Sequence, residues 1–493
     1  MQGPHSSPSS FCGLLYERLV PPASCYENPG AGGRKMSSGE VRMPRRVRRG
    51  WRILGWTLLG LVAALVALWV AAHWAAGRKL AATLADLRAR GELLTFAELI
   101  PPGISDDQNA AVLYLSVFAP TPPPVAGAQA AEVSATSVAG LSYDQEGLLG
   151  KYVAHPTPEG DREMAVLLAR PQVQRMLNLL RQGSDRPYCV LPGEWENPSP
   201  NPVQHLFRFP TCVRLAAAQA VLAGRSGDSA AAASWLAVGL RMARHLGQTP
   251  TLLSLLIEHH LISILFRVAP EALGTQPPWS TEVQELGRAL AALDLRGDSL
   301  RAIRGDRALA HAIFSQSIEA RTRSPRDAII LRLQRPLLRW DEVACLSFVD
   351  QVIAAAQADQ APPDSEQYLA QLPPRWVPDF LKAPLAGSMA RLLTRILPRT
   401  RAGQARIVVW QAALAVHRWR NAHGSYPDTL AQVAAEEAVP LDPFSGQALI
   451  YRREGQGFVL YSVGPNQQDD GGVPKTVGPA RRSPAGDIVW RVD

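Results

Sequence analysis

The strongest constraint on this chain is a charge-free, apolar run near its N-terminus, from Ile53 to Ala72. An α-helix rises about 1.5 Å per residue, so about 20 apolar residues cross a hydrocarbon layer about 30 Å thick. We therefore expect a transmembrane helix over residues 51–76. Tryptophans typical of membrane interfaces lie in and beside the run. They are Trp51, Trp56, Trp69 and Trp74.

A cleaved signal peptide is the alternative, because Val70, Ala71 and Ala72 resemble a processing site. The apolar core of a signal peptide is usually about 7–15 residues long, which is shorter than this run. Residues 1–41 are rich in Pro, Ser and Gly and have no hydrophobic periodicity, as in disordered tails. A start at Met36 or Met43 is an alternative to this tail.

Six arginines precede the apolar run and predict its orientation, because basic clusters beside a span stay in the cytoplasm. We expect residues 1–50 to be a disordered, basic cytoplasmic tail and residues after about Gly77 to lie outside the cytoplasm, with the span in a bacterial inner membrane. These arginines supply much of the net charge of +8, and we expect them to meet the lipid bilayer and not nucleic acid. They are Arg42, Arg45, Arg46, Arg48, Arg49 and Arg52.

The five cysteines leave two interpretations open. In an oxidising compartment Cys189 and Cys212 could form a disulfide, or they could be buried free thiols, which are common. Cys345 has no partner in either case. No CxxC pair occurs, so the sequence predicts neither a zinc ribbon nor a thioredoxin-like site.

Residues 77–159 are expected to form membrane-proximal helices and a linker. A helix over Lys79–Arg90 would place Leu80, Leu84 and Leu87 on one face and end at Gly91. Asp106 and Asp107 are predicted to cap a short helix through Val117. The segment from Pro120 to Val138 has no pattern and is interpreted as a linker.

Residues 160–400 show helical periodicity with few strand signals, which predicts an extracytoplasmic helical array. Asp228 is expected to cap a helix that directs Arg241, Arg244 and His245 toward water. The helix Thr251–Val268 is apolar nearly all round and should be buried. Arg301, Arg304, Asp306 and Arg307 are interpreted as a solvated helix face. The other predicted helices are Val166–Leu180 with a break near Pro171, Val213–Gly224, Glu282–Leu293, Asp298–Ser317 and Glu342–Gln357.

Residues 401–493 change character and predict a small α+β domain with a short antiparallel sheet. A helix over Ala402–Asn421 is followed by a short helix over Thr429–Glu437. The alternation of Ile488, Trp490 and Val492 indicates a third strand after a hairpin. The hairpin strands are Leu449–Arg453 and Phe458–Val463, joined through Glu454–Gly457.

A set of short motifs follows in a fixed order along the last 90 or so residues. They are His423-Gly424-Ser425-Tyr426-Pro427-Asp428-Thr429-Leu430, Leu441-Asp442-Pro443-Phe444, Tyr451, Phe458-x-Leu460-Tyr461-Ser462-x-Gly464 and Asp487-Ile488. In this order they resemble the C-terminal domain of the major pseudopilin of type II secretion systems. The helical middle is similar to uncharacterised, membrane-anchored bacterial envelope proteins that carry the same module. The pseudopilin resemblance implies an α+β fold and a calcium ion in the loop after the second strand.

By position, the resemblance assigns the calcium ligands to Asn466, Asp469, Asp470 and Asp487. Calcium takes about six to eight oxygen ligands, which carboxylates and carbonyls supply. Asn466 replaces an aspartate of the family, so it lacks that charge. Basic residues in the same loop could instead neutralise the aspartates without a metal, leaving a solvated turn. They are Lys475, Arg481 and Arg482.

The chain lacks the features by which pseudopilins polymerise. The span contains no acidic residue and no glycine processing motif, and it lies over 300 residues from the module. We therefore expect the module to serve contacts or stability. The predicted function is a single-pass envelope protein with a non-catalytic interaction or scaffold role and a protein partner in the envelope. An accessory component of a type II secretion-like system is an alternative.

An extracytoplasmic hydrolase with paired carboxylates is the other alternative. Glu194-Trp195-Glu196 resembles a carboxylate pair beside a sugar-stacking ring, although a charged loop is the simpler interpretation. Glu258-His259-His260 lacks the spacing of a zinc motif, so one histidine is expected in the core and one on the surface. No nucleophile elbow, phosphate loop or dinucleotide motif occurs. We therefore expect no catalytic residues and no enzyme activity.

Overall fold

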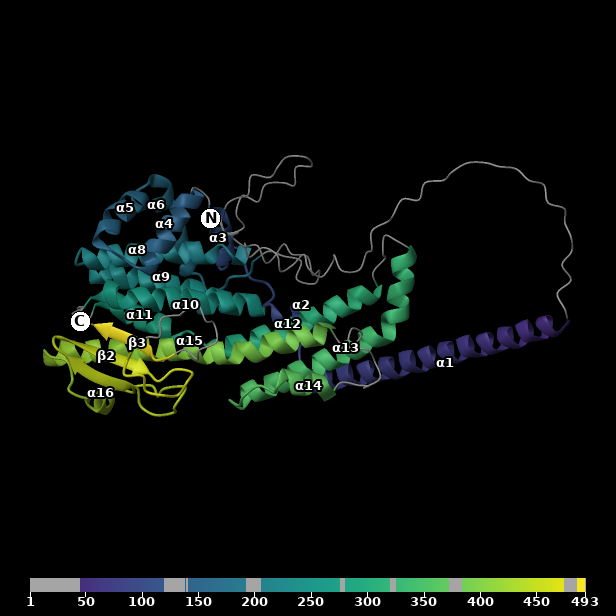
Figure 1. The fold of residues 1–493 in the computed structure, drawn as a ribbon. Coiled ribbons are helices and arrows are strands. Elements are labelled where there is room, and N and C mark those ends of the chain that lie inside the picture. Colours follow the sequence, from purple (N-terminus) through teal and green to yellow (C-terminus); the bar gives the residue numbers. More distant parts are fainter. Residues whose placement is uncertain are drawn as a thin grey trace, which may run out of the picture. The chain divides into compact units, whose positions relative to one another are not determined.

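The computed structural model describes residues 45–118, 138, 141–191, 205–274, 280–319, 325–371, 384–473 and 486–492. The described chain is mainly helical, with a three-stranded antiparallel sheet near the C-terminus (Figure 1), which confirms the predicted class. Contacts divide the chain into residues 1–67 and a second compact unit, residues 68–493.

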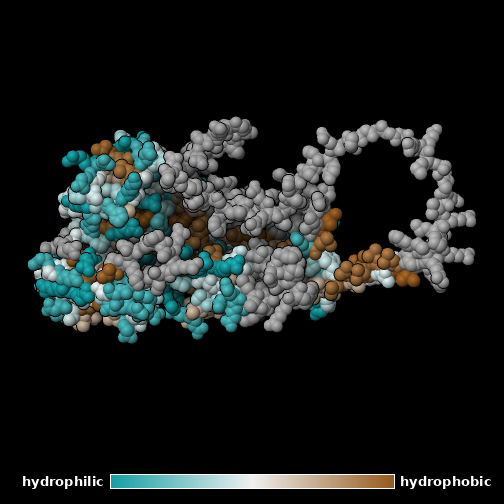
Figure 2. Space-filling view, in the orientation of Figure 1, coloured by the Kyte–Doolittle hydropathy of each residue, from teal (hydrophilic) through white to brown (hydrophobic). Residues whose placement is uncertain are grey.

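Helix α1 (Arg45–Ala89) contains the whole apolar run. Its large apolar side chains between Ile53 and Val70 are mostly exposed, and Figure 2 shows hydrophobic atoms along this helix. In the last part of α1 the pattern changes, because Leu87 is buried against Leu94 and Leu346. Leu80 and Leu84 pack against the same cluster, which confirms the predicted face. One helix thus carries an uncovered apolar stretch and a stretch that is packed on the folded unit.

The remaining helices agree with the predicted helical middle and extend it. Asp228 caps α9 by accepting the Ala231 N–H at 2.8 Å, as predicted. The cap of α3 was predicted wrongly: Asn109 accepts the Ala111 N–H at 3.1 Å, so neither Asp106 nor Asp107 is the cap. The helices are α2 (Phe96–Leu99), α3 (Ala110–Val117), α4 (Tyr143–Ala154), α5 (Pro158–Leu168), α6 (Pro171–Ser184), α8 (Phe209–Arg225), α9 (Ser229–Gly247), α10 (Leu252–Leu273), α11 (Thr281–Ala291), α12 (Leu295–Glu319), α13 (Pro325–Gln357), α14 (Ser365–Gln371), α15 (Pro384–His423) and α16 (Leu430–Glu436).

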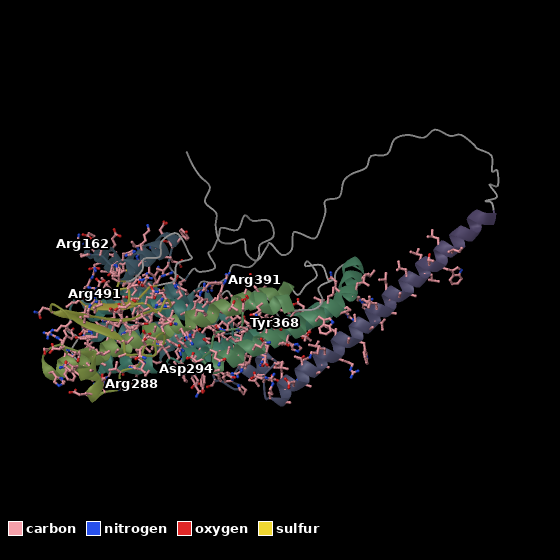
Figure 3. The ribbon with its side chains drawn as sticks, turned by 60° about the horizontal axis from the view of Figure 1, so that its bottom comes forward. Arg162, Arg288, Asp294, Tyr368, Arg391 and Arg491 are labelled. Carbon is pink, nitrogen blue, oxygen red and sulfur yellow. The ribbon has the colours of Figure 1, made fainter. Side chains whose placement is uncertain are left out.

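Three side-chain predictions for the helical middle are wrong. Asp306, predicted on a solvated face, is buried, and its Oδ1 accepts the Leu252 N–H at 3.2 Å. His245 is buried. Its Nε2 lies 2.8 Å from the Arg186 carbonyl and its Nδ1 lies 2.9 Å from the Tyr114 hydroxyl. Arg307 is fully buried and donates to Glu92 Oε2 at 2.5 Å. In each case, a second segment of the chain covers the helix face that was predicted to meet water. The outer surface carries charged side chains such as Arg162 and Arg491 (Figure 3).

The C-terminal sheet has the strand order β1-β2-β3 with antiparallel pairing throughout. The strands are β1 (Ile450–Glu454), β2 (Gly457–Ser462) and β3 (Ile488–Val492), which confirms the predicted hairpin and third strand. Gly455 in the hairpin turn has a φ of 56°, a conformation that glycine adopts at little cost. Every residue of β2 is buried, so this central strand is covered on both faces.

The sheet and the helical middle share one hydrophobic core. Helix α10 passes between them and is mostly buried, as predicted for Thr251–Val268. Phe266 on α10 packs edge-on against Trp410 of α15 at 6.4 Å and Trp490 of β3 at 5.8 Å, measured between ring centroids. Helix α15 begins at Pro384, well before the predicted Ala402, and packs on both regions. The C-terminal module is therefore held to the array by large aromatic contacts.

Candidate functional site

The four residues predicted to bind calcium lie in the loop between β2 and β3 and at the start of β3. Asp487 accepts the N–H groups of Asp470 and Gly472 at 3.3 and 2.8 Å. Asp469 accepts the Tyr461 hydroxyl at 2.9 Å, and Asn466 donates to Asp470 at 2.9 Å. The loop's own donors thus occupy these oxygens. Across the described ranges, no group of three or more His, Cys, Asp or Glu side chains is placed to hold a metal ion.

The negative charges of these neighbouring carboxylates repel one another, and a bound cation would reduce that repulsion. Burial raises the pKa of Asp487 above its usual range, and the charges of Asp470 and Asp469 raise it further. The basic residues predicted to neutralise this loop, Lys475, Arg481 and Arg482, lie outside the described residues. The oxygen donors therefore fit a calcium ion in kind, since a carboxylate oxygen that accepts one hydrogen bond keeps a lone pair for a metal.

Calcium binding in this loop remains a prediction, and chelation tests it. If calcium binds, removing it with a chelator should lower the melting temperature, because a ligand bound to the folded state stabilises that state. Asp487→Ala should abolish this response, whereas Glu163→Gln on exposed α5 should keep it. A melting temperature that ignores chelator and added calcium in the wild-type protein would contradict the calcium prediction.

The other candidates from the sequence are placed as follows. Glu194 and Glu196 lie outside the described residues. Cys189 and Cys212 are buried free cysteines, so no disulfide joins them. His259 is buried and His260 is exposed, as predicted for adjacent helical positions. Burial lowers the pKa of His259 to about 4, which keeps this imidazole neutral at physiological pH.

A carboxyl pair that the sequence did not predict lies where three helices meet. Glu258 on α10 is fully buried, and Asp298 on α12 is nearly so. Both approach Gly247, the last residue of α9: a Cβ there would lie 2.5 Å from Asp298 Oδ2 and 2.8 Å from Glu258 Oε1. Only glycine leaves room for the two carboxyl groups at this point. Arg301 donates to Asp298 and, at 2.6 Å, to the Gly247 carbonyl.

The surroundings of the pair favour the protonated form of Glu258. Burial raises the pKa of Glu258 well above its usual range, and the nearby Asp298 charge adds to this. Neither oxygen of Glu258 meets an N–H or O–H donor among the described residues. A protonated Glu258 can donate to Asp298, whereas two ionised carboxylates would only repel each other. Arg301 then balances the charge on Asp298. Burial raises the pKa of Asp298 as well, while the Arg301 charge lowers it. The arrangement therefore favours a proton on Glu258 and charge on Asp298.

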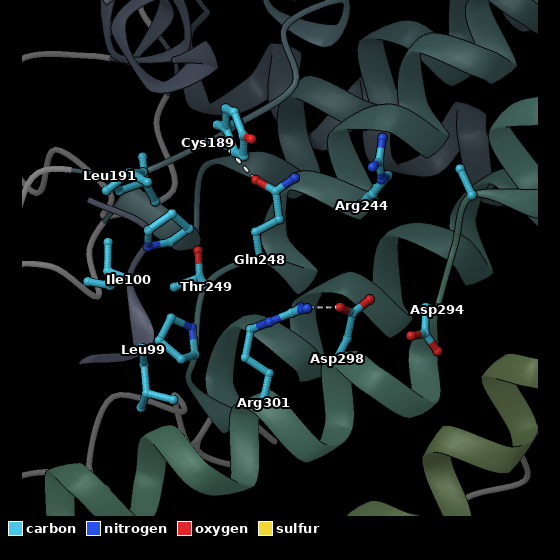
Figure 4. A pocket seen from close by; sticks show the side chains of 15 residues that line it. Leu99, Ile100, Cys189, Leu191, Arg244, Gln248, Thr249, Asp294, Asp298 and Arg301 are labelled. Atoms are coloured by element: carbon cyan, nitrogen blue, oxygen red, sulfur yellow. Dashed lines mark hydrogen bonds and ion pairs between the residues drawn. The ribbon is translucent and has the colours of Figure 1, made fainter. Parts of the chain in front are cut away.

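Asp298 and Arg301 also line a cavity of about 330 Å³ (Figure 4). Figure 4 shows the charged side chains of Arg244, Asp294 and Asp298 on one side and apolar side chains such as Leu191 on the other. Glu258 is not among the residues that line the cavity. A small molecule in this cavity would meet Asp298 and Arg301 directly, and the proton on Glu258 only through Asp298.

The raised pKa of Glu258 predicts that stability falls as pH rises. A carboxyl whose pKa is higher in the folded state contributes fully below the ordinary value of 4.5 and loses that contribution as pH rises through the raised value. Glu258→Gln should therefore flatten the decline in unfolding free energy as the pH rises above the ordinary value of 4.5. Denaturant titrations across this range measure the slope. Glu163→Gln on the exposed face of α5 is the matched control and should leave it unchanged.

An unchanged slope in Glu258→Gln would contradict a proton held at this site. The sequence indicated one of the two carboxyl groups, because Glu258 is an acidic residue in a mainly apolar predicted helix. Asp298 was predicted only as a helix start, because sequence distance does not reveal which helices touch.

Comparison of the chain with protein-family models, curated proteins and solved structures finds no match.

Proposed function

We propose that this chain is a single-pass membrane protein of the bacterial inner membrane, with its N-terminus in the cytoplasm and the bulk of the chain outside it. The observation that carries the proposal is the change of surface along α1. Its apolar stretch is exposed to an extent that water disfavours, whereas its last turns pack on the folded unit. A helix of this kind suits a permanent anchor, because the apolar stretch is continuous with the turns of α1 that pack on the folded unit.

The role we propose for the extracytoplasmic part is non-catalytic: it binds or braces a protein partner in the envelope. Support comes from the buried polar side chains, which serve structural contacts. Buried polar groups such as His245 and Arg307 are tied into packing between helices. The C-terminal module of this chain contains the predicted three-stranded sheet. Its resemblance to a pseudopilin domain favours a module used for contacts.

Co-purification tests this role. The full chain, tagged and extracted in mild detergent from its native membrane, should retain a defined partner in fixed proportion. The matched control is a variant of the exposed α5 surface, Val166→Asp, which should keep that partner unless α5 is the contact. A clean preparation that retains no partner and cleaves a glycan or peptide would contradict the proposal.

A hydrolase is the second candidate, and the pair of Glu258 and Asp298 favours it. A protonated carboxyl beside an ionised one is the arrangement that acid–base catalysis uses. A substrate in the cavity would not reach Glu258 directly, because Glu258 does not line the cavity. If the protein hydrolyses a glycan or peptide, Asp298→Asn should abolish turnover, while Arg288→Gln on exposed α11 should not.

A further inference from the structure

The first part of α13 carries apolar side chains that no described segment covers. Ile329 and Leu333 are 58% and 60% exposed, and their spacing of four residues places them on one face of the helix. Figure 2 shows hydrophobic side chains on this part of the molecule. Pro336 lies inside α13, and a proline inside a helix bends it.

This exposed part of α13 is fixed to α1 at the end of the apolar run. The indole N–H of Trp69 donates to the Leu333 carbonyl at 2.9 Å. Trp69 comes three residues before Ala72, the last residue of the run, which is about 4.5 Å along a helix. The backbone of Leu333 is therefore at the depth where the hydrocarbon layer would end.

Further contacts keep α13 beside α1 over several turns. Leu346 packs against Leu87, and Arg90 donates to Asp350 at 3.2 and 3.0 Å. Arg339 lies 3.2 Å from the His73 ring nitrogen. These contacts hold the part of α13 after Pro336 beside the end of α1.

The side chains around Trp69 and Leu333 are of the kinds that are common at membrane interfaces. Trp69 and His73 stack with ring centroids 5.1 Å apart, and Arg78 lies 4.6 Å from the Trp74 ring centroid. Arg332, between the two apolar positions of α13, is exposed. Tryptophan rings and arginine side chains are favoured where acyl chains meet phosphate groups, because each has an apolar body and a polar end.

We propose that the first part of α13 is a second membrane contact: it lies in the plane of the bilayer interface, with Ile329 and Leu333 among the outer acyl chains and Arg332 at the lipid phosphates. The occupant of this face is the bilayer, because the face continues from the span itself. A short helix of this kind binds lipid weakly alone, but its tether to α1 holds it at high effective concentration. The inference rests on the proposed anchoring by α1.

Spin-label accessibility in lipid tests this contact. The full chain with Cys12→Ser and Cys25→Ser is reconstituted in vesicles of phosphatidylcholine and phosphatidylglycerol. One nitroxide is attached at Leu333→Cys, at Leu65→Cys in the span, or at Val166→Cys on exposed α5. The native Cys189, Cys212 and Cys345 are buried and stay unlabelled. Collision rates with oxygen, which concentrates in lipid, and with a water-soluble nickel chelate are compared.

We expect the oxygen-to-nickel ratio at Leu333→Cys to exceed that at Val166→Cys several-fold and to approach that at Leu65→Cys. A ratio at Leu333→Cys equal to that at Val166→Cys, with Leu65→Cys in lipid, would overturn the second contact and leave the anchor intact. Low collision rates with both reagents at Leu333→Cys would also overturn it, since protein would then cover the face. If Leu65→Cys itself behaves like Val166→Cys, the anchoring proposal fails and the second contact with it.

Discussion

Replacing Leu61 and Leu65 by arginine is expected to move the protein from the membrane fraction to the soluble fraction. Both side chains are exposed on α1 within the charge-free run. An arginine near the centre of a span costs about 2.5–3.5 kcal/mol, and a leucine there contributes about 0.3–0.6 kcal/mol, so the double change costs roughly 6–8 kcal/mol. Ultracentrifugation after an alkaline carbonate wash, followed by immunoblotting, measures the distribution.

The matched control is the double alanine variant at the same positions, which keeps the run uncharged and should remain in the membrane. A second control, Val166→Arg, places the same charge on exposed α5 and should not change the distribution. Retention of the double arginine variant after carbonate would contradict a span over this run.

Gly305→Ala is expected to destabilise the folded unit by more than about 3 kcal/mol, because overpacking against rigid backbone is among the costlier core changes. Gly305 lies in α12 where the helix passes the backbone of Pro250, and a Cβ would overlap the Pro250 carbonyl. Neither partner can rotate away, since the contact is with main-chain atoms. Denaturant unfolding of the full chain in detergent, followed by circular dichroism, gives the change in unfolding free energy.

Gly287→Ala on α11 is the control for this substitution. A Cβ there would meet only Leu414 Cδ1, at 4.0 Å, which is an ordinary contact. Alanine is favoured over glycine in a helix by about 1 kcal/mol, so this variant should be as stable as the wild type or more stable. Equal effects of the two substitutions would show that α12 does not pack against Pro250 as closely as described.

Local structure was predictable from the sequence because its causes are local. Asp228 and Thr429 mark the starts of α9 and α16 through the polar caps that helices require. The alternation of Ile488, Trp490 and Val492 predicted β3, since successive side chains of a strand point to opposite faces. The one wrong cap, at α3, involved three residues of similar capping preference within four positions, Asp106, Asp107 and Asn109, and only the observed hydrogen bond selects Asn109.

The parts that could not be predicted depend on which elements touch. Periodicity places His245 and Arg307 on polar faces, but it does not reveal that Tyr114 and Glu92 cover those faces. The pair of Glu258 with Asp298 has the same origin, because the two carboxyl groups come from separate helices that meet at Gly247. The loop of Asp487 was located by sequence, yet its hydrogen bonds to backbone amides were not foreseen.

The central claim is that α1 crosses a membrane and leaves residues after about Gly77 outside the cytoplasm. Protease added to spheroplasts that express the full chain tests it most directly, with inverted membrane vesicles as the paired preparation and immunoblotting of the C-terminal part as the readout. We predict digestion in spheroplasts and protection in inverted vesicles. Protection in spheroplasts with digestion in inverted vesicles would contradict the claim.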